Sequence, residues 1–266
     1  MSKYRYEHIL FLRKIKREKM IVSIIQLMII LTFLILWEVL ARFSIINTFL
    51  YSSPSRIIHT IYSLFQSGDL FHHIGITLFE VFISFTLATL IGIIGASLLW
   101  CSKLLSKILD PYITILNSLP KVALGPLIII WIGASINSII FMALLISVFT
   151  TIITIYNGFL SVPNNRIILL KSLGASKLQI YSKVILPSNF ETIISTLKIN
   201  ISMSLIGVIM GELLVSKKGL GYLIMYGSQV FNLDLVISSI FLLGIISYFM
   251  YFVVDRVLVF VQKKRS

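Results

Sequence analysis

The chain has 266 residues, of which 58% are hydrophobic and 12% are charged, and its mean hydropathy is +0.99. Soluble domains contain roughly 45–50% apolar residues, so this composition excludes an ordinary water-soluble fold and predicts a membrane protein. The formal net charge is +13, and the single cysteine, Cys101, excludes an intrachain disulfide and a thiolate metal cluster.

Residues 1–20, MSKYRYEHILFLRKIKREKM, form a basic N-terminal tail. The tail is too long and too charged for the first part of a signal peptide, and the apolar run at 21–41 has no small-residue cleavage site. We therefore expect a retained first spanning helix at 21–41. Residues 21–266 are treated as one transmembrane domain that follows the tail.

Five further apolar segments approach the length of about 20 residues that a spanning helix needs. They lie at about 75–100, 111–132, 136–160, 193–215 and 235–260. The 111–132 segment has the weakest pattern, because Pro120, Lys121 and Pro126 interrupt it. The sequence predicts an all-α polytopic membrane protein with about six transmembrane helices.

The segment at 51–73 lies between the first two spans. Ser53 is a typical N-cap residue, and Pro54 fits the first position of a helix. Since one side of this segment is apolar, we expect a short helix that lies on the outer membrane interface. His72 and His73 end the segment, and we do not interpret this pair as a metal site.

The second span carries small side chains at four-residue spacing, which allows close helix packing in lipid. They are Ser84, Ala88, Gly92 and Ala96. We interpret this face as a helix–helix contact, within the chain or across a dimer. Glu38 and Glu80 lie nearer the ends of their spans, and we expect their carboxylates to reach the interface.

Two spans contain candidates for a translocation pathway. In the third span Asn117, Pro120 and Gly125 interrupt an apolar helix, and broken backbone at membrane depth is tolerated where it faces protein or a water-filled cavity. The fifth span carries a stripe of polar and small residues on one face, which indicates either close packing or a pathway wall. The stripe consists of Asn200, Ser204, Gly207 and Gly211, with Glu212 beside it.

Glu212 is the leading candidate for a functional charge inside the membrane, because such charges are costly and are usually functional. The alternative is a residue near the outer end of its span, either solvated or paired with Lys217 or Lys218.

The distribution of charge predicts the topology. With the N-terminus inside, the inner segments are the tail, 101–110, 161–198 and the C-terminus, and they hold most of the 23 Lys and Arg residues. An even number of spans places both basic termini on the cytoplasmic face of the cell membrane. The charge therefore indicates topology and contact with anionic lipid, and nucleic-acid binding is the weaker alternative.

The third inner segment begins with a short predicted helix. Pro163 ends the fourth span, and Asn164 or Asn165 can cap the new helix. Gly174 suits the left-handed residue that follows a helix C-terminus. We therefore expect a turn at Gly174.

A second helix follows that turn. Ser176 and Gln179 form a capping box at its start, and Pro187 stops or kinks it at its end. This pair of helices is either a docking surface just under the membrane or an amphipathic connector on the lipid headgroups.

The 172–187 stretch, SLGASKLQIYSKVILP, resembles the EAA loop of ABC-importer permeases. The resemblance rests on Gly174, on the helix that follows it and on the apolar-Leu-Pro ending at 184–187. Three other stretches are similar to permeases for nitrate, sulfonates, taurine and related compounds. They are YSSPSRIIHTIYSLFQSGDLFHHIGITL at 51–78, LDPYITILNSLPKVALGPLIIIWIG at 109–133 and GELLVSKKGLGYLI at 211–224.

The resemblance implies a type I ABC importer (MetI-like) transmembrane domain with a coupling loop at about 161–190. It also implies cytoplasmic ATPase subunits, an extracellular or periplasmic solute-binding protein and a second permease copy in a dimer, for which a homodimer is expected. No cofactor is implied. The residues implied to couple to the ATPase are Leu173, Gly174, Ala175, Ser176, Leu186 and Pro187.

One feature departs from the family pattern. The Glu-Ala-Ala triplet would fall on Ile168, Leu169 and Leu170, so the acidic contact to an ATPase is missing or moved. We therefore expect a partner cleft that is more apolar than usual.

The chain has no G-x-x-x-x-G-K-[ST], H-E-x-x-H or G-x-S-x-G sequence, so we predict that it is not itself an enzyme. The predicted function is the permease subunit of an ATP-driven importer for a small solute of the nitrate, sulfonate, taurine or vitamin-precursor class. The alternatives are a membrane scaffold that transports nothing and an ion-coupled secondary transporter, for which inverted repeats are expected. The sequence does not identify the substrate.

Overall fold

The computed structural model describes residues 2–265, so Met1 and Ser266 lie outside the described residues. Some of the basic side chains used to predict the topology also lie outside the described ones: Lys3, Arg5, Lys263, Lys264 and Arg265. The described residues are almost entirely helical. The long helices are α1 (Ser2–Arg42), α4 (Asp69–Cys101), α5 (Lys103–Ser118), α7 (Ile136–Leu160), α11 (Phe190–Val215) and α13 (Leu233–Arg265).

Shorter helices connect the long ones. They are α2 (Thr48–Tyr51), α3 (Pro54–Gln66), η1 (Lys121–Leu124), α6 (Gly125–Ile132), α8 (Asn164–Ser172), α9 (Lys177–Ile180), η2 (Tyr181–Ile185), α10 (Leu186–Ser188) and α12 (Leu220–Gln229).

Within the described residues, five helices are long and apolar enough to cross a membrane. They cover Arg13–Arg42, Asp69–Cys101, Ile136–Leu160, Phe190–Val215 and Leu233–Arg256. A sixth candidate span is broken, because α5 and the η1–α6 segment meet at an angle of 85°. The prediction of about six spans, with the third interrupted, is confirmed.

The connection between α4 and α5 differs from the prediction. We expected an inner loop at 101–110, but α4 ends at Cys101 and α5 begins at Lys103. Ser102 turns the chain alone, and its Oγ accepts a hydrogen bond from the backbone N–H of Leu105 at 3.2 Å. Hydropathy alone places the start of α5 too late, because the first turns of this helix contain polar residues and look like a loop in the sequence.

The small-residue face of α4 packs against α7 within the same chain. Ser84, Ala88 and Ala96 are fully buried. At Gly92, an added Cβ would lie only 2.3 Å from Cγ2 of Thr151 on α7. This confirms the prediction of a helix–helix contact and assigns it to the interior of the chain, where small side chains let the backbones approach.

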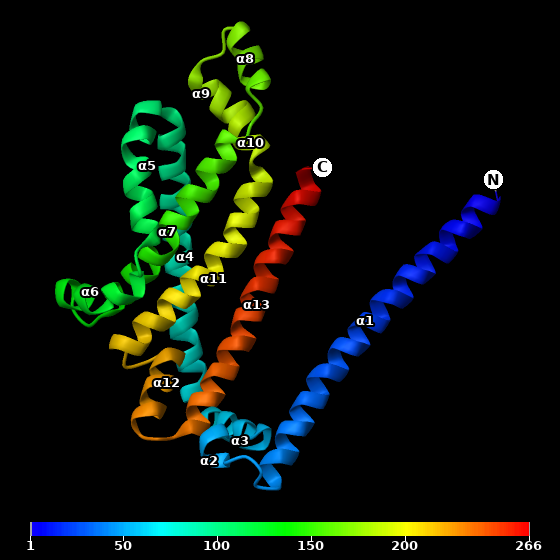
Figure 1. Cartoon of the computed structure of the whole chain (residues 1–266), viewed down its shortest axis with the longest axis vertical. Helices are drawn as coiled ribbons and strands as arrows, with labels where there is room; N and C mark the ends of the chain where they lie inside the picture. The colour runs from blue at the N-terminus through cyan, green and yellow to red at the C-terminus, as the bar shows by residue number, and fades with distance from the viewer. Residues whose placement is uncertain (1, 266) are drawn as a thin grey trace.

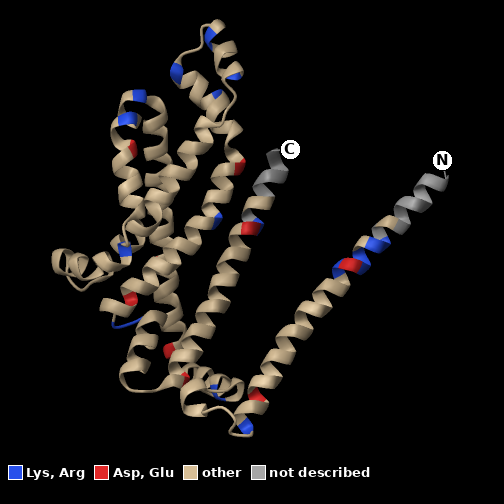
Figure 2. Ribbon diagram, in the orientation of Figure 1, with Lys and Arg blue, Asp and Glu red and all other residues tan. Residues whose placement is uncertain are grey.

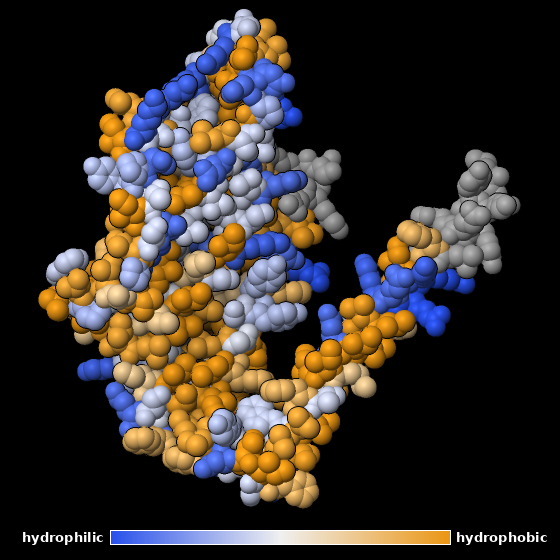
Figure 3. Space-filling model, viewed as in Figure 1, coloured by the Kyte–Doolittle hydropathy of each residue, from blue (hydrophilic) through white to orange (hydrophobic). Residues whose placement is uncertain are grey.

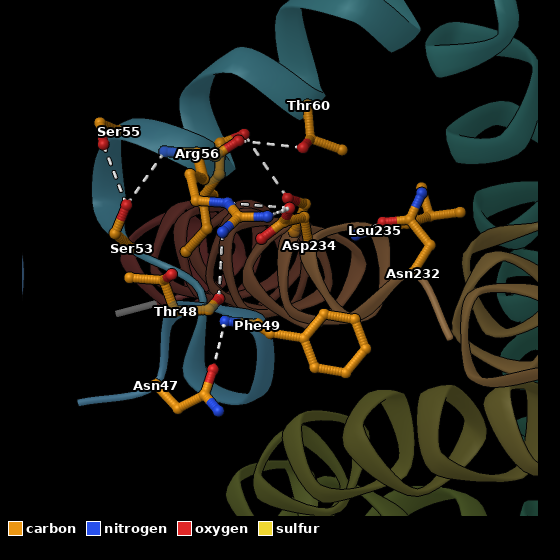
Figure 4. A network of polar contacts seen from close by, with 12 residues as sticks. Asn47, Thr48, Phe49, Ser53, Ser55, Arg56, Thr60, Asn232, Asp234 and Leu235 are labelled. Carbon is orange, nitrogen blue, oxygen red and sulfur yellow. Dashed lines mark hydrogen bonds and ion pairs between the residues drawn. The ribbon is translucent and has the colours of Figure 1, made fainter. Parts of the chain in front are cut away.

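At the α2–α3 end of the bundle, α3 is tied to α13 (Figure 4) and also contacts α1. As predicted, Ser53 caps α3, with its Oγ accepting from the N–H of Arg56 at 3.4 Å. The Arg56 guanidinium donates to Asp234 at the start of α13, with Nη2 2.5 Å from Oδ2, and to the carbonyl oxygen of Thr48. Glu38 of α1 accepts from the N–H of Ser55 at 3.0 Å.

Both ends of the chain lie toward the end of the molecule that carries α8 and α9, whereas α2, α3 and α12 lie at the opposite end (Figure 1). Lys and Arg residues concentrate on α8, α9, the first turns of α5 and residues 13–19 of α1 (Figure 2). Helix α1 stands apart from the bundle except at its C-terminal end, where it contacts α3, and between Met20 and Leu36 most of its side chains are apolar and exposed (Figure 3).

Candidate functional site

The 161–190 loop forms an elbow of two short helices. Helix α8 ends at Ser172 with Leu173 as its C-cap, and Gly174 takes the predicted left-handed conformation with φ of +77°. An added Cβ at Gly174 would meet nothing within 4 Å, so the backbone conformation alone requires glycine there. The predicted capping box is present, because the Ser176 N–H donates to Oε1 of Gln179 at 2.7 Å.

Two details of the elbow differ from prediction. Pro163, and not Asn164 or Asn165, is the N-cap of α8. The second helix is α-helical for only one turn and then widens into a π-helix, η2, in which the N–H of Leu186 donates to the carbonyl of Tyr181. Pro187 lacks an N–H and cannot bond to the carbonyl four residues earlier, which accounts for a wider turn just before it.

The tip of the elbow is apolar and faces away from the bundle. Leu173 and Leu178 are each 73% exposed, and Ile168 and Leu169 are 61% and 62% exposed. Exposed apolar patches mark sites of contact with protein or with membrane, so these four side chains are candidates for such a contact. Ile168 and Leu169 stand where the resemblance implies the Glu and the first Ala of the Glu-Ala-Ala triplet, so this surface is apolar at the position of the expected Glu.

The base of the elbow is fixed to the bundle. Ile180 and Ile185 pack with Ile155 and Phe159 of α7 in one buried apolar cluster. Tyr181 shares a hydrogen bond of 2.6 Å with Ser97 of α4, and its ring packs on Trp100 and Phe159. The base of the elbow therefore contacts both α4 and α7. We had not singled out Tyr181, which looks like an ordinary aromatic residue in the sequence.

The polar and small stripe of α11 lies inside the bundle. Asn200 is 2% exposed, Ser204 is fully buried, and the Asn200 amide donates to Oγ1 of Thr89 on α4 at 2.7 Å. An added Cβ at Gly207 would lie 2.4 Å from Cα of Ala143 on α7. At Gly211 it would lie 2.9 Å from Cα of Ile139. In this conformation the stripe is a packing face, and any contact of its residues with a solute stays a prediction.

Glu212 is also buried, at 1% exposed, and it is paired with neither lysine of the alternative interpretation. Its carboxylate accepts from Oγ1 of Thr77 on α4 at 2.7 Å and from the N–H of Gly221 at 2.6 Å. Thr77 Oγ1 in turn accepts from the N–H of Leu220. Nδ1 of His73 accepts from the N–H of Gly219 at 2.9 Å. The GLG turn at 219–221 is thus bound to both α4 and α11.

The expectation for Glu80 is wrong. Its side chain does not reach the interface but is 2% exposed, close to the buried Glu212. Its Oε2 has no hydrogen-bond partner among the residues that the structure describes. The physical reason is that α11 and α12 cover this part of α4.

The break in the third span brings together polar groups on α5, η1 and α7. Oδ1 of Asn117 accepts from Nζ of Lys121 at 3.2 Å and from Oγ1 of Thr150 at 3.1 Å. Asn117 is half-buried, and Pro120, at the break, is exposed. Lys121 is half-buried, and its Nζ also donates to the carbonyl oxygen of Ile146 on α7 at 3.5 Å. The contacts of this group with Thr150 and Ile146 could not be predicted, because both residues are distant in the sequence. These residues stay candidates for the pathway.

The bundle, its broken span and its exposed apolar elbow define an integral, multi-pass membrane protein. Residues 88–266 match the family described as the binding-protein-dependent transport system inner membrane component. The chain therefore belongs to this family of ABC transporter permeases.

The chain is similar to a probable ABC transporter permease protein of Haemophilus influenzae, with 30% identity over 232 residues that cover 87% of this chain and 94% of that protein. It is 28% identical over 211 residues to SsuC of Bacillus subtilis, named as an aliphatic sulfonates transport permease protein, which covers 79% of this chain and 76% of SsuC. The expected subgroup of permeases is confirmed.

A solved structure of the MetNI methionine ABC transporter in an inward-facing conformation has a chain with the same fold. Its TM-score is 0.61 at 22% identity, and the match covers 69% of this chain and 91% of that chain. At this identity the likeness establishes the fold alone, which is the predicted MetI-like helical fold.

Proposed function

We propose that the chain is the permease subunit of an ATP-driven importer in which two copies enclose a route for a small solute. ATPase subunits would bind the elbow on the cytoplasmic side, and a separate binding protein would deliver the solute from outside. Since the elbow and both termini lie toward one end of the molecule (Figure 1), this orientation makes both termini cytoplasmic.

The observation that carries the proposal is the apolar tip on a rigidly anchored elbow. Leu173 and Leu178 are exposed, whereas Tyr181 and the cluster around Phe159 connect the base of the elbow to α4 and α7. An ATPase that closes around the tip on binding ATP would therefore move spanning helices. Leu186 and Pro187 are half-buried at the base, and we assign them to this transmission rather than to the ATPase contact.

For the solute route we propose the surface around the broken span, with Asn117 and Pro120 beside it. Asn200, Ser204 and Glu212 would shape the route from behind by holding α11 in place. The solute class stays that of the subgroup, with sulfonates favoured by the name of one relative, and selectivity would reside largely in the binding protein.

Purification of the tagged chain from membranes in mild detergent, together with co-expressed ATPase subunits, tests the proposal. Leu178→Asp places a charge in an apolar contact and should abolish co-purification, because burying an unpaired charge costs several kcal/mol. Leu178→Met keeps the side chain apolar and should retain the ATPase. Equal recovery of the ATPase with both variants would contradict the proposed docking surface.

A topology test is independent of the ATPase. In a Cys101→Ser background, Leu178→Cys should react with a membrane-impermeant maleimide only after cells are permeabilised. Gln66→Cys, at the exposed end of α3, should react in intact cells. The reverse pattern would place the elbow outside.

A further inference from the structure

A cavity of about 530 Å³ lies where the ends of α4, α5 and α7 meet α8 and α9. Its volume falls in the range of roughly 300–1,000 Å³ that is typical of small-molecule sites. Trp100 and Tyr156 form part of its wall. The Tyr156 hydroxyl is held by a hydrogen bond of 2.5 Å to Ser106, so this aromatic wall is fixed in place.

The cavity carries positive charge without an opposing acid. Lys103, Lys171 and Lys177 line it, and no acidic side chain is among its lining residues. Lys177 Nζ donates to the carbonyl oxygen of Cys101 at 2.5 Å, which holds this amine at the carboxyl end of α4. Neither Lys103 nor Lys171 forms an ion pair with any residue that the structure describes. An anion is the ligand that such a site favours.

The cavity also lies at headgroup depth. Trp100 is in the last turn of the spanning helix α4, and Lys103 is the first residue of α5. Ends of spanning helices mark the membrane–water interface, where Trp and Tyr are enriched. Leu98 and Leu104, on the same helix ends, are 55% and 71% exposed. A ligand here would meet cations and aromatic rings at one end and apolar side chains at the other.

We propose that this cavity binds the headgroup of an anionic phospholipid. The lipid phosphate lies between Lys103 and Lys171, and the glycerol and upper acyl carbons lie on Trp100 and Tyr156. Basic pockets between spanning helices are suited to such headgroups. The site depends neither on the transported solute nor on which face of the membrane carries the elbow. By occupying the space between the elbow and the bundle, the lipid stiffens the connection between them.

The chain has three tryptophans, so Trp37→Phe with Trp131→Phe leaves Trp100 as the only fluorophore. The full-length variant is placed in phosphatidylcholine nanodiscs that contain phosphatidylglycerol with brominated acyl chains, which quench tryptophan on contact. Trp100 should be quenched at a lower mole fraction of brominated phosphatidylglycerol than of brominated phosphatidylcholine. Equal quenching by the two lipids would overturn the proposal.

Lysine variants test the assigned contacts. Lys103→Ala and Lys171→Ala should each weaken the preference by about fivefold, which corresponds to ~1 kcal/mol for one basic residue at a membrane surface. Lys107→Ala is the matched control, because Lys107 lies on the same helix, exposed and outside the cavity, and it should leave the preference unchanged. A loss of equal size with Lys107→Ala would show general surface attraction and overturn the site.

Two further conditions of the quenching experiment distinguish a lipid from other ligands of the cavity. Inorganic phosphate in the buffer should not relieve the quenching, since a free anion lacks the acyl chains, and relief would assign the cavity to a soluble anion instead. Loss of the lipid preference when ATPase subunits bind would assign it to the protein interface. Native mass spectrometry of the chain with its tryptophans intact should show phosphatidylglycerol retained, and retention reduced by Lys103→Ala with Lys171→Ala.

Discussion

Gly219 is a residue at which backbone and side-chain constraints coincide. Its φ is +101°, and an added Cβ would lie 2.3 Å from Cδ of Glu212. Most residues with a side chain at this position would strain the backbone and also displace a buried carboxyl group. The Gly of the GLG turn is thus explained by its contact with Glu212.

We predict that Gly219→Ala lowers the thermal stability of the detergent-solubilised protein, measured by intrinsic fluorescence. The left-handed backbone costs roughly 1–2 kcal/mol for a residue with a Cβ, and displacement of the Glu212 carboxyl adds to it. Gly68→Ala is the control, because Gly68 has a φ of +81° but open space around it. If both variants lose the same stability, the contact between Gly219 and Glu212 does not contribute to stability.

The Thr77 hydroxyl makes a second testable contribution. It donates to Glu212 and accepts from the N–H of Leu220, and Thr77 is fully buried. Thr77→Val keeps the shape of the side chain but removes the hydroxyl, so Glu212 and the N–H of Leu220 each lose a hydrogen-bond partner. We expect the free energy of unfolding to fall by about 1–3 kcal/mol for each unsatisfied group. Thr86→Val on the same helix removes a hydroxyl that bonds only to the carbonyl of Phe82. Denaturant titration should show the larger loss for Thr77→Val, and an equal loss would contradict this reading.

At the scale of elements, Gly174 joins α8 to α9. Gly174→Val places a β-branched residue at a φ of +77°, with a strain of roughly 1–2 kcal/mol. The elbow should distort, and stimulation of ATP hydrolysis by the binding protein should fall about tenfold, the factor for ~1.4 kcal/mol, while basal hydrolysis persists. Gly174→Asn, which tolerates this conformation, should retain stimulation. Normal stimulation in Gly174→Val would exclude Gly174 as the hinge.

The elements that could be predicted from the sequence are those fixed by local physics. A run of about 20 apolar residues defines a span wherever it occurs, and the capping box of Ser176 with Gln179 involves neighbours three residues apart. The π-helical turn before Pro187 was missed because a proline predicts the loss of a hydrogen bond but not how the helix relaxes around it.

The contacts that escaped prediction join residues that are distant in the chain. Glu80 meets Glu212, Asn117 meets Thr150 and Tyr181 meets Ser97, and each pair depends on how separate helices pack. Hydropathy places a residue along the membrane normal but does not say which side of its helix is covered. For this reason Glu80 was assigned to the interface, and Glu212 to a pathway or a lysine.

At the scale of the whole molecule, α6 is not covered by the rest of the chain. This short helix stands out from the bundle (Figure 1), and Ile130 and Trp131 are 76% and 73% exposed. The backbone is non-helical on both sides of the η1–α6 segment, at Leu119–Pro120 and at Gly133–Ser135. Irregular backbone at membrane depth is not stable against lipid and must be covered by protein or line a water-filled cavity.

A second copy of the chain is the covering protein that we propose. A photo-crosslinking amino acid at position 130 should therefore yield a product of twice the chain mass when membranes are irradiated. The same amino acid at position 82 is the control, because Phe82 is 66% exposed on a regular part of α4, where lipid is an adequate neighbour. Crosslinking at position 130 only to lipid would mean that no second copy covers α6, and the two-copy route would then lose its structural basis.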